Sequence, residues 1–141
     1  MEKRIDIIPY LTFNGNCEEA LRTYMEAFGG KIHHLSRWDR QNCGRPEQIG
    51  TVMHVEFRLG NTPMGAGDNF DFSGDPAVKL MVHLDTMEKA RHAIDTLAAG
   101  GGTVLSPLHP HPAPDDGGCG SATRDRFGYV WFVTCPNPDK Q

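Results

Sequence analysis

A histidine and a glutamate stand two residues apart in the segment MHVEFRL (53–59). Side chains two apart on a strand point to the same face, so His54 and Glu56 can contact one bound molecule together. An imidazole and a carboxylate are typical general bases and typical metal ligands. Two side chains of one strand do not enclose an ion, so a metal site here needs ligands from other strands. The residues that alternate with them are apolar, which predicts that the opposite face packs against a helix.

Four further side chains are candidates for contact with a ligand. The alternation in VKLMVHL (78–84) places His83 on the face opposite the apolar residues. An internal offset of about 68 residues pairs Glu56 with Arg124, so the same face is polar in the second half of the chain. Tyr10 and Trp38 offer aromatic surfaces on which a ligand could stack. A binding cleft has such a face, and so has a solvated sheet.

The composition predicts one globular domain, residues 1–141. A net charge of −4 gives no basic surface for nucleic acid, and no apolar run approaches the ~20 residues needed to cross a bilayer. The four cysteines lack C-x-x-C spacing, and the first residues lack the apolar segment of a signal peptide. We therefore expect a reduced, cytoplasmic protein with no nucleic-acid or membrane partner.

The chain repeats its pattern after about 70 residues. Segments 16–30 and 85–102 both carry apolar residues at helical spacing and end in glycines. Asn16 opens the first helix and Asp85 or Thr86 the second, each Asx residue being followed three positions later by glutamate, as in a capping box. Two helices with matching start and stop signals indicate a duplicated unit.

The strands repeat as well. Segments 7–13 and 78–84 precede the two helices, and two hairpins turn at Gly60 and Gly128. Each half therefore reads βαβββ. In the last strand Trp131 shares the parity of the apolar residues, which predicts that it lies in the core.

The predicted fold is α+β, with two βαβββ modules at about 5–68 and 78–135. We expect a pseudo-twofold axis between the modules, cupped mixed sheets and helices outside them. A ferredoxin-like sandwich whose halves agree by chance is the alternative. Segments 40–50 and 109–120 are predicted to be flexible loops, and the prolines and glycines of the second argue against a central strand there.

Three segments carry a resemblance to a known family. PYLTFNGNCEEALRTYMEAFGGKI (9–32), MHVEFRLGNTPMGAGD (53–68) and DRFGYVWFVTCP (125–136) resemble the PhnB-like proteins, with Arg126 where that family usually has proline. This family belongs to the glyoxalase/bleomycin-resistance/extradiol-dioxygenase superfamily, the vicinal oxygen chelate fold. The resemblance implies paired βαβββ modules, a homodimer and a cleft formed by cupped sheets.

Enzymes of this superfamily bind a divalent metal through His or carboxylate side chains on the first and last strands of each module. The matching positions in this sequence hold Pro9 or Tyr10, Met64 or Gly65, Lys79, and Phe132. Proline, methionine, lysine and phenylalanine do not form a divalent metal site of this kind. We therefore predict no metal ligand and no cofactor. A divalent metal is the alternative, because enzymes of the superfamily bind one.

The resulting prediction is a small-molecule-binding protein that works without a functional metal. Its predicted ligand contacts are Tyr10, Trp38, His54, Glu56, His83 and Arg124. The alternative is a metal-dependent glyoxalase-like lyase or isomerase, or a dioxygenase, with Glu56 or His54 as base. A metal-free enzyme with Glu56 as base and Arg124 stabilising an oxyanion is a third possibility. The identity of the ligand lies beyond the sequence.

Overall fold

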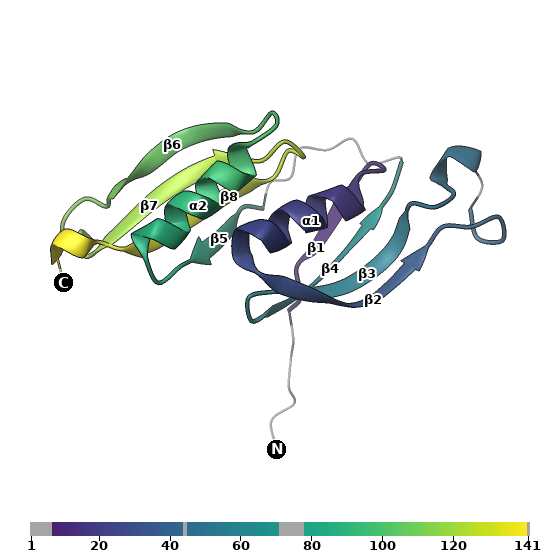
Figure 1. Cartoon of the computed structure of the whole chain (residues 1–141), viewed down its shortest axis with the longest axis horizontal. Helices are drawn as coiled ribbons and strands as arrows, with labels where there is room; N and C mark the ends of the chain where they lie inside the picture. The colour runs from purple at the N-terminus through teal and green to yellow at the C-terminus, as the bar shows by residue number, and fades with distance from the viewer. Residues whose placement is uncertain (1–6, 44, 71–77, 141) are drawn as a thin grey trace, which may run out of the picture. The chain divides into compact units, whose positions relative to one another are not determined.

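The computed structural model describes residues 7–43, 45–70 and 78–140. The chain divides into two compact units, residues 1–73 and 74–141, which correspond to the two predicted modules (Figure 1). Residues 5 and 6 of the first predicted module and residue 44 of the first predicted loop lie outside the described residues. Whether the two units form one domain stays a prediction.

The first module has the order βαβββ. Its elements are β1 (Tyr10–Phe13), α1 (Cys17–Phe28), β2 (Gly30–Arg37), β3 (Val52–Leu59) and β4 (Thr62–Asp68). The four strands form one mixed sheet in the order β1-β4-β3-β2, with β1 parallel to β4. Between β2 and β3 the described residues include a 3-10 turn at 46–48, and the flexibility expected of segment 40–50 stays a prediction.

The second module repeats this order. Its elements are β5 (Leu80–His83), α2 (Met87–Ala98), β6 (Thr103–Pro110), β7 (Gly118–Arg124) and β8 (Val130–Pro136), with a short 3-10 turn at 138–140. The sheet order β5-β8-β7-β6, with β5 parallel to β8, matches the first sheet strand for strand. The predicted α+β fold of two βαβββ modules is confirmed.

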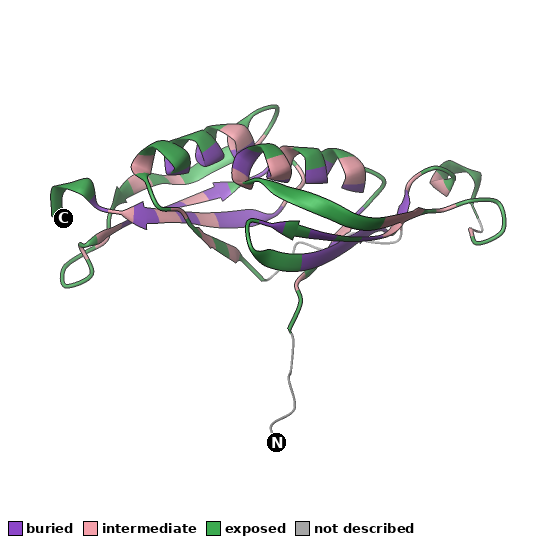
Figure 2. Cartoon of the chain, turned by 60° about the horizontal axis from the view of Figure 1, so that its bottom comes forward, coloured by how far each residue is buried: buried purple, intermediate pink, exposed green. Residues whose placement is uncertain are grey.

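Each sheet buries one face under its own helix, because apolar residues recur at helical spacing in α1 and α2 and at every second position in the strands. Leu21 and Tyr24 of α1 are fully buried, as is Leu97 of α2. Figure 2 shows that each helix has buried and exposed stretches along its length. On β8 the indole of Trp131 is 2% exposed, which confirms its predicted place in the core. We call the opposite, helix-free side of each sheet its open face.

The predicted capping box of the first helix is wrong. Asn16 is the N-cap residue of α1, but its side chain makes no capping hydrogen bond. Asp68 of β4 caps the helix instead, since its Oδ1 accepts hydrogen bonds from the amides of Gly15 and Cys17 at 2.8 and 3.0 Å. In α2 the predicted cap Thr86 is confirmed, and its hydroxyl accepts from the amide of Lys89.

The second loop, predicted over 109–120, is shorter in the structure than the prediction. Strand β6 continues to Pro110, and β7 begins at Gly118. Proline is tolerated because β6 is an edge strand and Pro110 is its last residue. The glycines of β7 lie in a central strand, where Gly120 leaves room for the ring of His111.

The predicted match of Glu56 with Arg124 is shifted by two residues. Arg124 lies opposite Val130 at the hairpin end of β7, as Arg58 lies opposite Pro63 at the hairpin end of β3. The turn after Arg124 is longer than the turn at Gly60, so a single offset does not hold through the hairpin.

Candidate functional site

On the open face of the first module, an aromatic ring lies against two glycines of the neighbouring strand. Tyr10 of β1 pairs with Gly65 of β4, and Gly67 follows two residues later on the same face. A Cβ at Gly65 would come within 2.7 Å of the Tyr10 ring, and one at Gly67 within 2.8 Å of the Tyr10 hydroxyl. The ring therefore lies along β4, with its hydroxyl above Gly67. Only glycine at both positions permits this close approach.

A pocket of about 430 Å³ opens beside this hydroxyl. It is lined by Tyr10, Thr12, Trp38, Gln48, Met53, Gly67, Asp68 and Asn69. The indole of Trp38 is held there by a hydrogen bond from its Nε1 to the backbone oxygen of Asp68, at 3.3 Å. The two predicted stacking residues, Tyr10 and Trp38, thus line the same pocket.

The chemistry of this pocket suits an uncharged, flat molecule. Two aromatic rings and the thioether of Met53 offer apolar and polarisable surface, and Gln48 and Asn69 offer amide groups. Of the described residues that line it, Asp68 alone has an acidic or basic side chain, and its carboxylate is taken up by the amides of Gly15, Cys17 and Val52. The volume lies within the range of about 300–1,000 Å³ that small-molecule pockets occupy.

His54 and Glu56 lie next to the Tyr10 ring on the same open face. The rings of Tyr10 and His54 are stacked, with centroids 5.9 Å apart, and the Tyr10 hydroxyl lies 3.4 Å from His54 Nδ1. His54 Nε2 lies 3.9 Å from a Glu56 carboxylate oxygen. Burial is the main reason that the pKa of Tyr10 is raised, so this phenol keeps its proton at physiological pH.

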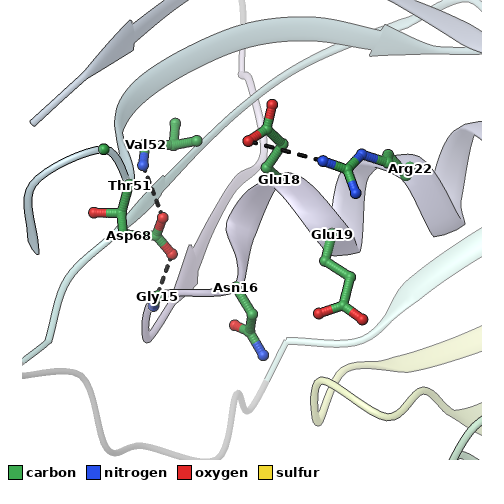
Figure 3. A pocket seen from close by; sticks show the side chains of 9 residues that line it. Gly15, Asn16, Glu18, Glu19, Arg22, Thr51, Val52 and Asp68 are labelled. Atoms are coloured by element: carbon green, nitrogen blue, oxygen red, sulfur yellow. Dashed lines mark hydrogen bonds and ion pairs between the residues drawn. The ribbon is translucent and has the colours of Figure 1, made fainter. Parts of the chain in front are cut away.

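Asp68 connects the pocket to the fold beneath it. Its Oδ2 accepts a hydrogen bond from the amide of Val52 at 2.9 Å, while its Oδ1 caps α1 (Figure 3). A second, smaller hollow of about 240 Å³ lies on this helix side, and Figure 3 shows Glu18 and Glu19 at its edge. Burial, followed by the charges of Asp68 and Glu18, raises the pKa of Cys17 to about 12, so Cys17 is an inert thiol.

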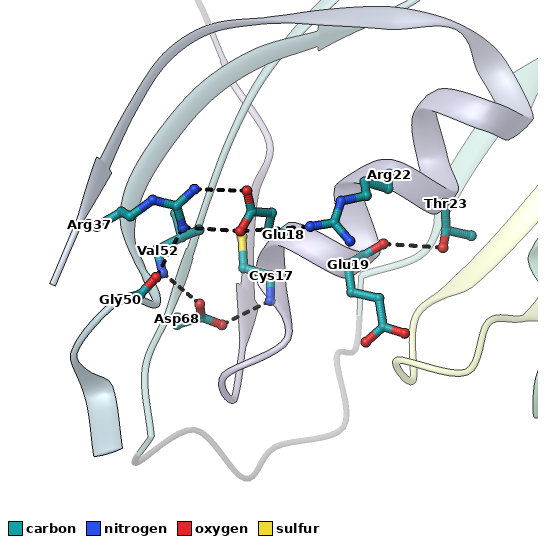
Figure 4. A network of polar contacts seen from close by, with 9 residues as sticks. All are labelled: Cys17, Glu18, Glu19, Arg22, Thr23, Arg37, Gly50, Val52 and Asp68. Carbon is teal, nitrogen blue, oxygen red and sulfur yellow. Dashed lines mark hydrogen bonds and ion pairs between the residues drawn. The ribbon is translucent and has the colours of Figure 1, made fainter. Parts of the chain in front are cut away.

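An ion pair braces the loop that carries Gln48. Arg37 at the end of β2 donates two hydrogen bonds to the carboxylate of Glu18, at 2.8 and 3.0 Å, and one to the backbone oxygen of Gly50 (Figure 4). The hydrogen bonds from Arg37 lower the pKa of Glu18. The start of α1, the end of β2 and the pocket loop are thereby joined.

The other two predicted ligand contacts lie in the second module. His83 Nδ1 lies 2.9 Å from the hydroxyl of Thr134, and Arg124 lies opposite Val130, four residues away along β8. Both occupy the open face of their own sheet, but they are at different ends of it. The structure does not bring His83 and Arg124 together.

The residues present do not fit a divalent metal. The open-face pairs between the first and last strands are Tyr10 with Gly65 in one module and Met81 with Phe132 in the other. One row further, His83 lies opposite Thr134. Residues 7–43, 45–70 and 78–140 contain no group of three or more His, Cys, Asp or Glu side chains arranged to hold an ion.

The sequence alone predicts only two of the eight residues that line the pocket, Tyr10 and Trp38. Thr12 has the strand parity of Tyr10, and this signal could have identified it. Gln48 lies in the loop 40–50, which was recognised only as a loop. Asp68 is the last residue of β4 and Asn69 follows it, and nothing local shows that Asp68 caps a helix some fifty residues earlier in the chain.

Comparison with known proteins places this geometry in a family. The sequence profile of the family described as 3-demethylubiquinone-9 3-methyltransferase matches residues 5–134. A comparison with curated proteins gave no match. No helix among the described residues has the length and apolar character needed to cross a membrane.

Solved structures give the same result. A Bacillus cereus protein described as a 3-demethylubiquinone-9 3-methyltransferase, PhnB protein, is 29% identical, with a TM-score of 0.78, and the match covers 93% of this chain and 99% of that one. A Pseudomonas aeruginosa protein is 28% identical, with a TM-score of 0.80 and coverage of 94% and 98%. A glyoxylase/bleomycin resistance protein/dioxygenase domain from Frankia sp. shares the fold at 17% identity, with a TM-score of 0.66 and coverage of 96% and 100%.

Proposed function

This chain belongs to the family described as 3-demethylubiquinone-9 3-methyltransferase, the PhnB-like proteins of the vicinal oxygen chelate superfamily, and from that premise we propose that it binds a small planar molecule without a metal. The proposed site is the pocket between Tyr10 and Trp38. The observation that carries the proposal is the close approach of the Tyr10 ring to Gly65 and of its hydroxyl to Gly67, which places that hydroxyl at the pocket.

This arrangement lowers the intrinsic stability of strand β4, which we take as a sign that the two glycines serve binding. Glycines inside a strand weaken it by roughly 0.5–1 kcal/mol each relative to alanine. The glycines allow the aromatic ring of Tyr10 to lie against the strand, at the same pocket as Trp38. A bound ring would stack on these surfaces, and its polar edge would meet Gln48 and Asn69.

The proposal includes no metal, because the positions that would supply ligands hold tyrosine, glycine, methionine and phenylalanine. A metal-dependent lyase, isomerase or dioxygenase with Glu56 or His54 as base needs three or more ligands around one ion. A metal-free enzyme that uses Glu56 and Arg124 needs both side chains at one substrate, and neither of them lines the proposed pocket.

A methyl-donor site receives no support from the glycines of the segment GAGD (65–68). Glycine-rich nucleotide loops connect a strand to a helix N-terminus. Here Gly65 and Gly67 lie inside β4, paired with Tyr10 and Thr12 of β1. We expect no heat of binding when S-adenosylmethionine is titrated into the protein.

The test combines metal analysis with a screen of planar aromatic fragments. Fragments should quench the fluorescence of the wild-type protein and lose this effect in Trp38→Phe, while Met81→Ala, an open-face change in the other module, should behave as wild type. Purified protein should contain far less than one divalent ion per chain. A stoichiometric, tightly held divalent ion, or quenching that survives Trp38→Phe, would contradict the proposal.

We further propose a homodimer in the cytoplasm. The family resemblance supports the dimer, and large apolar side chains such as Ile7, Val78 and Met81 are more than two-thirds exposed in the isolated chain, at 92%, 73% and 72%. The four free cysteines agree with a reducing compartment. Light scattering on a sizing column should give twice the mass of one chain.

A further inference from the structure

The pocket hydroxyl of Tyr10 lies beside the imidazole of His54 on the same open face. Tyr10 Oη lies 3.4 Å from His54 Nδ1, and His54 Nε2 lies 3.9 Å from Glu56. Histidine is the side chain whose charge ordinarily changes between about pH 5 and 8. A change of charge on His54 is therefore felt directly at the Tyr10 oxygen.

The direction of the hydrogen bond depends on that charge. In neutral His54 the nearby Glu56 carboxylate favours a hydrogen on Nε2, which leaves Nδ1 as an acceptor for the Tyr10 O–H. The remaining lone pairs of the Tyr10 oxygen then accept from a ligand. In protonated His54 both ring nitrogens are donors, so Nδ1–H donates to Tyr10 and the Tyr10 hydrogen is free to donate to a ligand.

We infer that His54 sets the hydrogen-bonding polarity of the Tyr10 hydroxyl, so that the pocket prefers a planar ligand with an O–H or N–H donor when His54 is neutral and loses that preference when His54 is protonated. This inference rests on the proposed function, and it names the ligand chemistry of the same pocket. A planar phenol or a heteroaromatic N–H compound is the class that fits the neutral form.

The other titratable groups around His54 are few. On the open face, Tyr10 lies on β1, Glu56 and Arg58 lie on β3 with His54 itself, and His34 of β2 lies opposite Glu56. The facing positions of β4 are glycines. Burial raises the pKa of Tyr10, so the phenol stays protonated throughout the range in which histidine titrates.

The test compares two probes that differ only in one hydrogen-bond donor. Calorimetric titrations of 2-naphthol and 2-methoxynaphthalene into the wild-type protein should show the naphthol about tenfold tighter at about pH 8, the equivalent of one net hydrogen bond. At about pH 5 the ratio should fall towards one. Tyr10→Phe should give a ratio near one at both pH values.

His54→Phe keeps an aromatic neighbour but cannot titrate, so its ratio should be the same at both pH values. His92→Gln, which removes a histidine from the exposed side of α2, should keep the wild-type pH dependence. Far-UV circular dichroism checks that each variant is folded.

The outcomes separate the two proposals. If both probes bind with a ratio that does not change with pH, or if the pH dependence survives His54→Phe, this inference is wrong and the proposed function stands. If neither probe binds the wild-type protein, the proposed pocket fails, and the inference fails with it.

Discussion

The two modules share one order of elements but begin their helices in different ways. In the second module Thr86 caps α2 from the position next to the helix. In the first module Asp68 caps α1 from the far end of β4. The same residue uses its backbone oxygen to hold Trp38 on the open face. The first module therefore ties its pocket to its helix through one residue, and the second module has no such link among its described residues.

The open faces of the two modules also differ, in the residues of their last strands. The last strand of the first module carries Gly65 and Gly67, and the last strand of the second carries Phe132 and Thr134. Glycines let the Tyr10 ring lie against the strand. Among the described residues, the two modules thus share the pattern of their core and differ on the open face, where the first has an aromatic ring against two glycines and the second has Phe132 and Thr134.

The largest expected effect is on the long-range cap. Asp68→Ala leaves three amides without their acceptor and should lower the free energy of unfolding by about 3 kcal/mol. Thr86→Ala, the matched change in the second module, should cost about 1 kcal/mol. Urea denaturation followed by circular dichroism measures both. Equal losses would show that the two caps are equivalent and would remove this contrast between the modules.

The two tryptophans should separate stability from binding. Trp131 donates from Nε1 to the carboxylate of Asp125 at 2.8 Å in the core, so Trp131→Phe should cost about 2 kcal/mol. Trp38→Phe should change stability by less than about 1 kcal/mol, because this side chain is only half-buried. Denaturation curves of both variants provide the measurement, and a larger loss for Trp38→Phe would contradict its assignment to the pocket.

The contact between Tyr10 and Gly65 should show a pairwise coupling. Gly65→Ala brings a methyl group against the Tyr10 ring and should cost about 1–2 kcal/mol. In a Tyr10→Ala background the same substitution should stabilise by up to about 1 kcal/mol, because the ring is gone, the backbone oxygen of Val55 is 3.6 Å away, and alanine is better than glycine inside a strand. A double-mutant cycle by thermal denaturation measures the coupling. Purely additive effects would mean that the ring does not rest on Gly65.

The smallest effect concerns acid stability. The hydrogen bonds from Arg37 lower the pKa of Glu18 in the folded state below its unfolded value, which is about 4.3 for glutamate. The stabilisation from this pair is therefore present above that unfolded pKa and is lost as the pH falls through the lower folded pKa. Because both side chains are more than a third exposed, the contribution is small.

Melting temperatures of wild type and Glu18→Gln measured across this range test the pair. The wild type should melt slightly higher at neutral pH, and the difference should vanish in strong acid. A difference that persists in strong acid would point to a cause other than the charge of Glu18. Asp85→Asn is the matched change in the second module, since the neighbouring Lys89 also lowers the pKa of Asp85.

The sequence alone predicted the fold well, because its signals are local. The alternation in residues 53–59 correctly predicted Val55 and Phe57 as buried and Glu56 as exposed, but it put Met53 with them, and Met53 lines the open-face pocket because the pairing of β2 with β3 is irregular there. The site was predicted only in part. Tyr10 and Trp38 were identified as aromatic surfaces, but Asp68 acts on amides some fifty residues earlier in the chain, and such a contact has no local pattern.

The loop prediction failed for a related reason. Proline and glycine counts treat residues 109–120 as one segment, whereas the backbone uses Pro110 at a strand end and Gly120 under a histidine ring. The role of these residues depends on their neighbours in the sheet. Composition gives the frequency of turn residues and cannot give those neighbours.

The most direct test of the account is the pair of indole N–H signals in a nitrogen-correlated NMR spectrum. Titration with 2-naphthol should shift the signal of Trp38 and leave that of Trp131 in place, with backbone shifts around Gly67 and Asn69. Trp38→Phe assigns the two signals. A ligand that shifts the Trp131 signal and amides around His83 instead, with Trp38 unmoved, would contradict the placement of the binding site in the first module.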